Sequence, residues 1–69
     1  MKEYVLIYDL PRNHKALQMR VLRALHNFET KRLQHSVWKS IDLSELIRIA
    51  TFIKKSGGNA TILEEKLIF

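Results

Sequence analysis

No cysteine occurs anywhere in the 69 residues, and glycine and proline are scarce, with two copies and one copy. The lack of cysteine excludes a disulfide framework, a thiolate nucleophile and a cysteine-ligated zinc site. A chain of this length forms one domain, residues 1–69, and buries only roughly 60% of its unfolded surface. Because cysteine offers no covalent or metal staple, we expect self-association to supply further buried surface.

Long apolar runs are also missing from the chain. None approaches the ~20 residues that a membrane helix needs. The first four residues, MKEY, lack the apolar region and cleavage site of a signal peptide. The hydrophobic content of 46% is that of a globular chain rather than a disordered one. We therefore expect a soluble, cytoplasmic protein with no membrane partner.

Acidic residues are few between residues 12 and 32. The formal net charge is +5, and this segment has one acid, Glu29, against six basic residues: Arg12, Lys15, Arg20, Arg23, Lys31 and Arg32. A basic balance focused on one segment favours a polyanionic partner, most often a nucleic acid. Arginine in particular suits phosphate. The alternative is a hydrated helix surface whose charges serve solubility.

Residues 3–9 predict the first strand. Their apolar run, residues 4–8 (YVLIY), is continuous and rich in β-branched and aromatic residues, which is typical of a strand covered on both faces. Asp9 follows at the carboxyl end of the strand, where ligands often bind in open α/β architectures. Asp9 is therefore a candidate site residue, with the alternative that it only starts the turn before Pro11.

Residues 14–27 predict an amphipathic helix with Asn13 as its N-cap. Apolar residues recur in it at helical spacing: Leu17, Val21, Ala24, Leu25 and Phe28. Arg20, Arg23 and Asn27 fall on the opposite side, three and four residues apart. These three form either a phosphate-binding surface or the hydrated side of a helix.

Residues 30–41 alternate in the manner of a strand but contain neither glycine nor proline to mark a tight turn. They predict either one long strand or two short strands joined near Ser36 or near residues 39–40. Trp38 either packs in the core or stacks on a base or a partner. His35 is either a general base at a cleft or a structural residue on a strand face.

A second helix is predicted from Asp42, an acidic N-cap with Glu45 three residues on. Its buried stripe is predicted to comprise Leu43, Leu46, Ile47, Ala50 and Ile53, widened by Ile49 and Phe52. Gly57 and Gly58 suit the left-handed conformation that ends a helix. Residues 60–63 predict the last strand.

The predicted order is strand, helix, one or two strands, helix, strand. With two middle strands it is an α+β, ferredoxin-like split βαβ sandwich, with two helices on one face of an antiparallel sheet. The other face would expose apolar side chains of the first strand. In so small a protein a second copy is the natural cover, so we expect a homodimer.

Two motifs resemble those of the CRISPR-associated Cas-two family. Residues 4–10, YVLIYDL, resemble the family's opening strand, an apolar run followed by Tyr-Asp-Ile. Residues 32–38, RLQHSVW, resemble its second signature, Arg-Val/Ile-Gln-x-Ser-Val-Phe, with leucine and tryptophan as departures. A basic amphipathic helix lies between the motifs, as in the family, so the resemblance covers nearly the whole chain.

The resemblance implies a ferredoxin-like homodimer of spacer acquisition that binds duplex DNA or RNA beside the Cas-one integrase. It also implies metal-dependent endonuclease activity, with Asp9 as the catalytic residue and the ligand of a shared Mg²⁺. Arg20 matches a first-helix arginine, Arg32 the arginine that opens the second signature, and Trp38 its closing aromatic. We expect the nucleic acid to be bound by Arg12, Arg20, Arg23, Arg32 and Trp38.

The residues themselves set a minimum for such a metal site. Magnesium is usually held by one or two carboxylates with waters and substrate oxygens, and it can stabilise a phosphate and activate a water. Asp9 has no neighbouring acid in the sequence, so two copies at a dimer axis just meet this minimum. The alternative function is that of a toxin-like ribonuclease similar to virulence-associated protein D.

Overall fold

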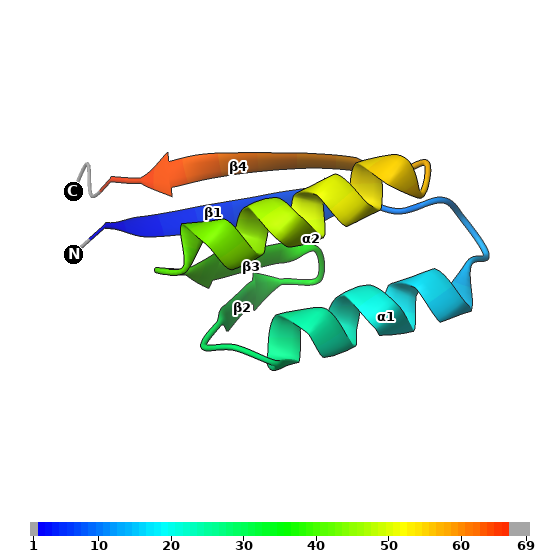
Figure 1. Ribbon diagram of the computed structural model, residues 1–69, viewed down its shortest axis with the longest axis horizontal. Helices are drawn as coiled ribbons and strands as arrows, with labels where there is room; N and C mark the ends of the chain where they lie inside the picture. Colours follow the sequence, from blue (N-terminus) through cyan, green and yellow to red (C-terminus); the bar gives the residue numbers. More distant parts are fainter. Residues whose placement is uncertain (1, 67–69) are drawn as a thin grey trace.

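The strand β1 (Glu3–Asp9) lies at the centre of the fold. The computed structural model describes residues 2–66, in which β1 runs antiparallel to both of its neighbours in a four-stranded sheet of order β2-β3-β1-β4 (Figure 1). The other elements are α1 (Lys15–His26), β2 (Lys31–Gln34), β3 (Val37–Ser40), α2 (Leu43–Lys55) and β4 (Asn59–Glu65). This βαββαβ order confirms the predicted α+β class and is consistent with a ferredoxin-like arrangement. No helix in the described part of the chain could cross a membrane.

Both helices pack on the same face of the sheet, so successive side chains of β1 alternate between the buried face and the exposed face. Leu6 points toward the helices and is fully buried, whereas the next residue, Ile7, is 40% exposed. The sequence predicts cover on both faces of this strand, but the described residues of a single chain cover only one. The outer face of the sheet therefore presents apolar side chains to solvent.

The helix α1 begins one residue later than the sequence predicts. His14 is the N-cap, and its Nδ1 accepts a hydrogen bond of 3.2 Å from the backbone N–H of Leu17. Asn13, the predicted cap, has a φ of +62° and belongs to the turn before the helix. Asparagine tolerates this left-handed conformation better than most residues, so Asn13 turns the chain and the cap passes to His14.

The middle segment forms two strands rather than one. β2 and β3 meet at a turn through His35 and Ser36, which settles the alternative in favour of the bend near Ser36. The turn is held next to the carboxyl end of the central strand β1, because the backbone N–H of Tyr8 donates to the Ser36 carbonyl over 3.1 Å. β2 carries an irregularity between Arg32 and Gln34.

The start of α2 is fixed by two short polar contacts. The Asp42 carboxylate accepts from the backbone N–H of Glu45 over 3.1 Å, as predicted for an N-cap. The backbone N–H of Asp42 itself donates to the hydroxyl of Ser40 over 3.0 Å, and that buried hydroxyl donates to the Glu29 carbonyl over 2.7 Å. Ser40 therefore joins the end of β3, the start of α2 and the loop before β2.

The buried stripe of α2 contains Leu46, Ile49, Ala50 and Ile53. Ile47, which the sequence places in this stripe, is 50% exposed. α2 packs over β1 and β4, and β4 is an edge strand. Ile47 lies on the side of the helix toward that edge, where it lines a shallow groove with Ala60 and Ile62. The prediction is wrong at this position because sequence periodicity does not reveal where the sheet ends.

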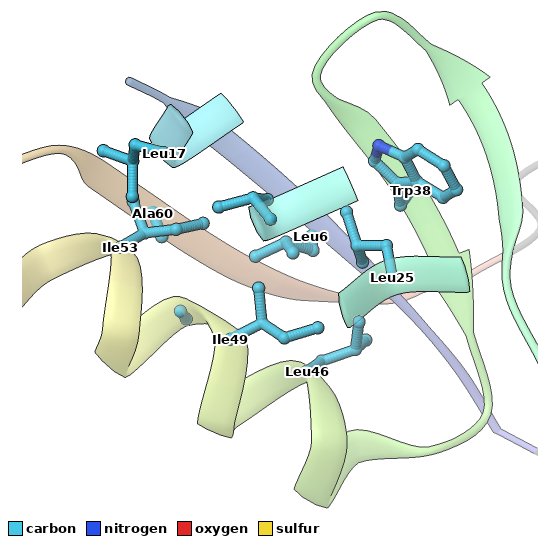
Figure 2. Packing of buried hydrophobic residues seen from close by; sticks show 10 residues of the cluster. Leu6, Leu17, Leu25, Trp38, Leu46, Ile49, Ile53 and Ala60 are labelled. Atoms are coloured by element: carbon cyan, nitrogen blue, oxygen red, sulfur yellow. The ribbon is translucent and has the colours of Figure 1, made fainter. Parts of the chain in front are cut away.

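The core lies between the helices and the inner face of the sheet (Figure 2). Its largest fully buried side chains are Trp38, Leu6, Leu25, Leu46, Ile53 and Val21. Full burial of one such aliphatic side chain contributes about 1.5–3 kcal/mol. Both helices and three strands supply residues to this cluster, so it holds the whole sandwich together.

The outer face of the sheet has a charged end. Lys39 of β3 lies 3.2 Å from a carboxylate oxygen of Glu65 on β4 and 3.7 Å from one of Glu3 on β1. The hydrogen bond from Lys39 to Glu65, with the charge of Glu3, raises the pKa of Lys39 above its ordinary value of 10.5. Lys39 is therefore charged at neutral pH, and on the alkaline side these pairs weaken as the pH rises through that raised pKa.

The turn from α2 into β4 packs tightly against the end of β1. Gly57 has a φ of +92°, which confirms the predicted left-handed helix end. A Cβ on Gly58 would lie 2.5 Å from the Asp9 carbonyl oxygen and 2.9 Å from Cγ2 of Ile53. The second glycine is therefore required by a close approach of two backbones, and it fixes the position of the Asp9 peptide.

We predict that Gly58→Ala destabilises the protein by about 1–3 kcal/mol, the usual cost of forcing extra atoms into a packed site. Urea unfolding followed by circular dichroism measures this change. Ser44→Ala, at an exposed position of α2, is the control and should change the free energy of unfolding by less than about 0.5 kcal/mol. A Gly58→Ala protein as stable as the wild type would show that the two backbones do not approach so closely.

Candidate functional site

A cleft of about 360 Å³ opens beside the carboxyl end of β1. Three parts of the chain form its walls: the end of β1, one flank of α1, and β2 with the turn that follows it. The lining residues are Tyr8, Asp9, Leu10, Gln18, Met19, Leu22, Arg32, His35 and Ser36. The cleft thus brings Asp9 and Arg32, from the two motifs, into one cavity.

Arg32 is the most firmly held polar side chain of the cleft. It pairs across the strands with Trp38, so its side chain lies on the helix side of the sheet. Its Nη2 donates to the His35 carbonyl over 3.0 Å and lies 3.2 Å from Nδ1 of the same residue. Its guanidinium carbon is 5.2 Å from the centre of the Trp38 ring. These contacts fix the guanidinium and leave its other N–H groups for a ligand.

The contact with Arg32 also defines the state of the His35 ring. A guanidinium can only donate hydrogen bonds, so Nδ1 of His35 must be the acceptor in this contact. The neutral ring then carries its proton on Nε2. His35 therefore brings a second donor to the cleft, beside the hydroxyl of Ser36.

Asp9 is the exposed last residue of β1, and it pairs with Asn59 of β4. It is the carboxylate among the residues that line the cleft. Within residues 2–66, no three His, Cys, Asp or Glu side chains gather in a group that could hold a metal ion. A Mg²⁺ site typically uses one or two protein carboxylates. One chain offers Asp9 alone, and a second copy of the chain would bring the number to two.

Trp38 lies in the core rather than on a surface. Its side chain is 1% exposed, packs edge-on against the His26 ring at 5.3 Å, and leaves Nε1 without a hydrogen-bond partner among the described residues. In Figure 2 the indole stands on β3 beside Leu25 of α1. Trp38 is paired with Leu6, whose side chain also faces the helices. Its ring is therefore out of reach of a nucleic acid, contrary to the stacking role expected for it.

The other arginines expected to bind nucleic acid are all exposed. Arg12 lies in the turn after β1, and Arg23 lies on α1. Arg20 is held above the Phe52 ring, 4.9 Å from its centre, and lines a shallow groove of about 260 Å³ between the helices. Arg48 of α2 lines the same groove. The structure therefore separates Arg32, in the cleft, from Arg20, between the helices.

Arg48 was not among the residues expected from the sequence. The available signal was its place on α2 opposite the apolar stripe, seven residues before Lys55. This position alone does not identify Arg48 as a binding residue. Its role depends on the two helices lying side by side, which places Arg48 in the same groove as Arg20. The charge of this helical layer, defined as the exposed surfaces of α1 and α2, differs from that of the rest of the molecule.

The two helices hold six of the twelve basic residues and one of the seven acids, Glu45. The basic residues are Lys15, Arg20, Arg23, Arg48, Lys54 and Lys55. The whole net charge of +5 therefore lies on the helices, and the strands, turns and ends are neutral in sum. The sequence pointed to residues 12–32 as the basic segment, but that segment leaves out Arg48, Lys54 and Lys55 of α2. The helical layer includes them and accounts for the whole net charge.

Comparison with known proteins adds no assignment. No family model matches the chain, and no curated protein matches it.

Proposed function

We propose that the protein is a dimeric scaffold that binds duplex DNA or RNA along the phosphate backbone through its helical layer. The observation that carries this proposal is the location of the net charge, which lies entirely on α1 and α2. A duplex presents a regular array of phosphates, and a surface with several cations attracts it through counterion release. Such binding depends little on base sequence, because the contacts are made to phosphates.

The arrangement of the arginines supports this role. The Phe52 ring below Arg20 restricts its guanidinium, so less side-chain entropy is lost when a phosphate binds. Arg48 lies across the groove and is 3.9 Å from the Glu45 carboxylate, a weak exposed pair that a phosphate can replace. Arg23 and Arg12 extend the basic surface along α1 and into the turn before it.

The outer face of the sheet supports the homodimer. Ile7 lies between Val37 of β3 and Thr61 of β4, and Val5 lies opposite Leu63. Val5, Ile7, Val37 and Leu63 form an apolar area on the side without helices, where Ile7 and Leu63 are 40% and 52% exposed. Lys39, the cross-strand partner of Val5, and Thr61 border this area. Packing of two such faces would bury them and would leave both basic helical layers facing outward. A second copy fits because the face is apolar at its centre and has charges of both signs at its end.

The biological setting proposed is spacer acquisition beside the Cas-one integrase. Its support is the resemblance of residues 4–10 and 32–38 to the Cas-two motifs together with the βαββαβ order. In this setting the dimer would hold the duplex while the integrase performs the chemistry.

A second candidate function, a metal-dependent endonuclease, is favoured by one observation. The cleft places Asp9 in the same cavity as Arg32, His35 and Ser36. Asp9 would be the residue that holds Mg²⁺, with its copy in the second subunit, and the ion would supply charge stabilisation to a phosphodiester. Arg32 is suited to hold the phosphate, and the Nε2–H of His35 is suited to donate a hydrogen bond to a phosphate oxygen.

We predict that Arg20→Gln with Arg23→Gln weakens duplex binding about equally for unrelated sequences. Each phosphate contact contributes about 0.9 to the slope of log K against log salt, so the slope should fall by about 2 when both cations are lost. Fluorescence anisotropy of a labelled duplex at several salt concentrations measures this. The control is Lys2→Gln with Lys31→Gln, which removes equal charge from outside the two helices and should leave the slope within about 0.5. Equal slopes for both double variants would exclude the helical layer as the binding surface.

We predict that the wild-type protein sediments as a dimer of the 8.2 kDa chain and that Ile7→Lys sediments as a monomer. The lysine would place an unpaired charge in the apolar centre of the interface. Ile47→Lys is the control, because Ile47 is at least as exposed as Ile7 but lies on α2, and this variant should remain dimeric. A wild-type mass near 8.2 kDa at micromolar concentration would contradict the homodimer.

We predict that Asp9→Asn abolishes Mg²⁺-dependent cleavage but changes duplex affinity by less than about twofold. The amide keeps the shape of the carboxylate but binds a hard cation far more weakly. Cleavage of labelled RNA and DNA with Mg²⁺ or with chelator, measured beside the anisotropy titration, tests both parts. If the variant cleaves as fast as the wild type, Asp9 is not the metal ligand, and the binding proposal is unaffected.

A further inference from the structure

The cleft combines three kinds of wall. One side presents hydrogen-bond donors: the free N–H groups of Arg32, the Nε2 proton of His35 and the hydroxyl of Ser36. Asp9, at the carboxyl end of β1, is the acidic residue of the cleft. The wall from α1 presents the apolar side chains of Met19 and Leu22 beside the amide of Gln18. A ligand that matches all three needs an anionic group, an apolar flat body and at least one donor.

The positions of these groups set the length of the ligand. Arg32 is on β2 and Asp9 is on β1, and β3 lies between them. Arg32 is level with Leu6, because both pair with Trp38, and Asp9 lies three residues farther along β1. Two strand spacings across the sheet and three residues along it amount to about 14 Å between Cα atoms. The volume of about 360 Å³ is at the small end of the range for ligand pockets. The cleft therefore suits one compact molecule that reaches from β2 to β1.

We propose that this cleft binds a single phosphorylated nucleotide unit, either a free nucleoside monophosphate or the phosphorylated terminal nucleotide of a strand. Arg32 holds the phosphate with help from Ser36, because a fixed guanidinium matches the geometry of phosphate oxygens. The base lies against Met19 and Leu22. Asp9 accepts a hydrogen bond from a sugar hydroxyl or an amino group. None of these contacts uses the basic residues of the helical layer, so this inference does not rest on the proposed duplex binding.

The cleft and the helical groove lie on different flanks of α1. Met19 lines the cleft, whereas Arg20, the next residue, lines the groove toward α2. Consecutive residues of a helix differ by about 100° in direction. Binding in the cleft and binding on the helices can therefore be removed independently.

Trp38 provides a direct readout of this binding. It is the only tryptophan of the chain, and the Arg32 guanidinium lies against its ring. A phosphate that binds Arg32 should change the emission of Trp38. The experiment is a titration of the wild-type protein with adenosine monophosphate, with adenosine as the control ligand and calorimetry as a second measurement.

We expect saturable binding of the monophosphate and at least tenfold weaker binding of adenosine, the effect of about one hydrogen bond between charged groups. Arg32→Gln should weaken monophosphate binding by about tenfold or more. Lys31→Gln is the matched control, because Lys31 is the preceding residue of β2, has the same charge and pairs with Lys39 of the outer face. It should change the dissociation constant by less than about twofold.

A second pair of variants tests the proposal even if Arg32→Gln does not fold. Met19 is 47% exposed, so polar replacements should be tolerated there. Met19→Glu, which adds a negative charge to the cleft, should weaken monophosphate binding about tenfold relative to Met19→Gln. A short single strand with a 5′-phosphate, compared with the same strand without it, distinguishes the sources. Tenfold preference for the phosphorylated strand identifies a strand end, and binding of the free monophosphate alone identifies a free nucleotide.

The proposal is overturned if neither the monophosphate nor the phosphorylated strand binds saturably at millimolar concentration. It is also overturned if Lys31→Gln weakens binding as much as Arg32→Gln, or if Met19→Glu and Met19→Gln bind equally. Arg20→Gln with Arg23→Gln should leave monophosphate binding unchanged. Loss of duplex binding with intact nucleotide binding, or the reverse, therefore shows which of the two proposals fails.

Discussion

The packing of both helices on one face of the sheet is the constraint on which the rest of the structure depends. It forces each strand to divide its side chains between a buried face and an open one. Leu6 and Ile7 show the result, since the first is in the core and the second is 40% exposed. A chain of 69 residues has no further element with which to cover the open face among its described residues. The same packing gathers the basic residues of two separate helices into one layer.

These consequences give the molecule two different surfaces. The outer face of the sheet is apolar at its centre, with the Lys39 ion pairs at its end, and suits a second copy. The helical layer carries the entire net charge and suits a polyanion. The cleft lies between them at the end of β1, where Gly58 fixes the Asp9 peptide by close backbone contact. Binding, self-association and a ligand site can therefore occupy separate surfaces of a very small protein.

Much of the fold could be predicted from the sequence because the local signals agree with the tertiary structure. The continuous run before Asp9, the cap at Asp42 and the left-handed glycine at Gly57 all mark elements that the structure contains. The predicted N-cap at Asn13 was wrong. Asn13 has a positive φ and belongs to the preceding turn, so the next residue, His14, caps the helix. Ile47 was misplaced because its exposure depends on where β4 ends the sheet.

The candidate site was harder to predict than the fold. Asp9 and Arg32 were identified singly, but their presence in one cleft depends on strand order, since β2 and β1 are separated by β3. The walls from Met19 and Leu22 resemble ordinary helix positions in the sequence. Trp38, the closing aromatic of the second motif, was expected either to stack on a base or to pack in the core, and its pairing with Leu6 on the inner face puts it in the core. Sequence patterns show which face of a helix or strand is apolar, but they do not show which other element packs against that face.

The central claim is that the helical layer is the polyanion-binding surface. The most direct test is a map of backbone amide chemical shifts of ¹⁵N-labelled protein during titration with an unrelated-sequence DNA duplex at low salt. We expect the perturbed amides to lie in α1 and α2 and in the turn around Arg12, while those of the outer-face residues Val5, Ile7 and Leu63 stay unchanged. Perturbation concentrated on the strands, with the helices unaffected, would contradict it.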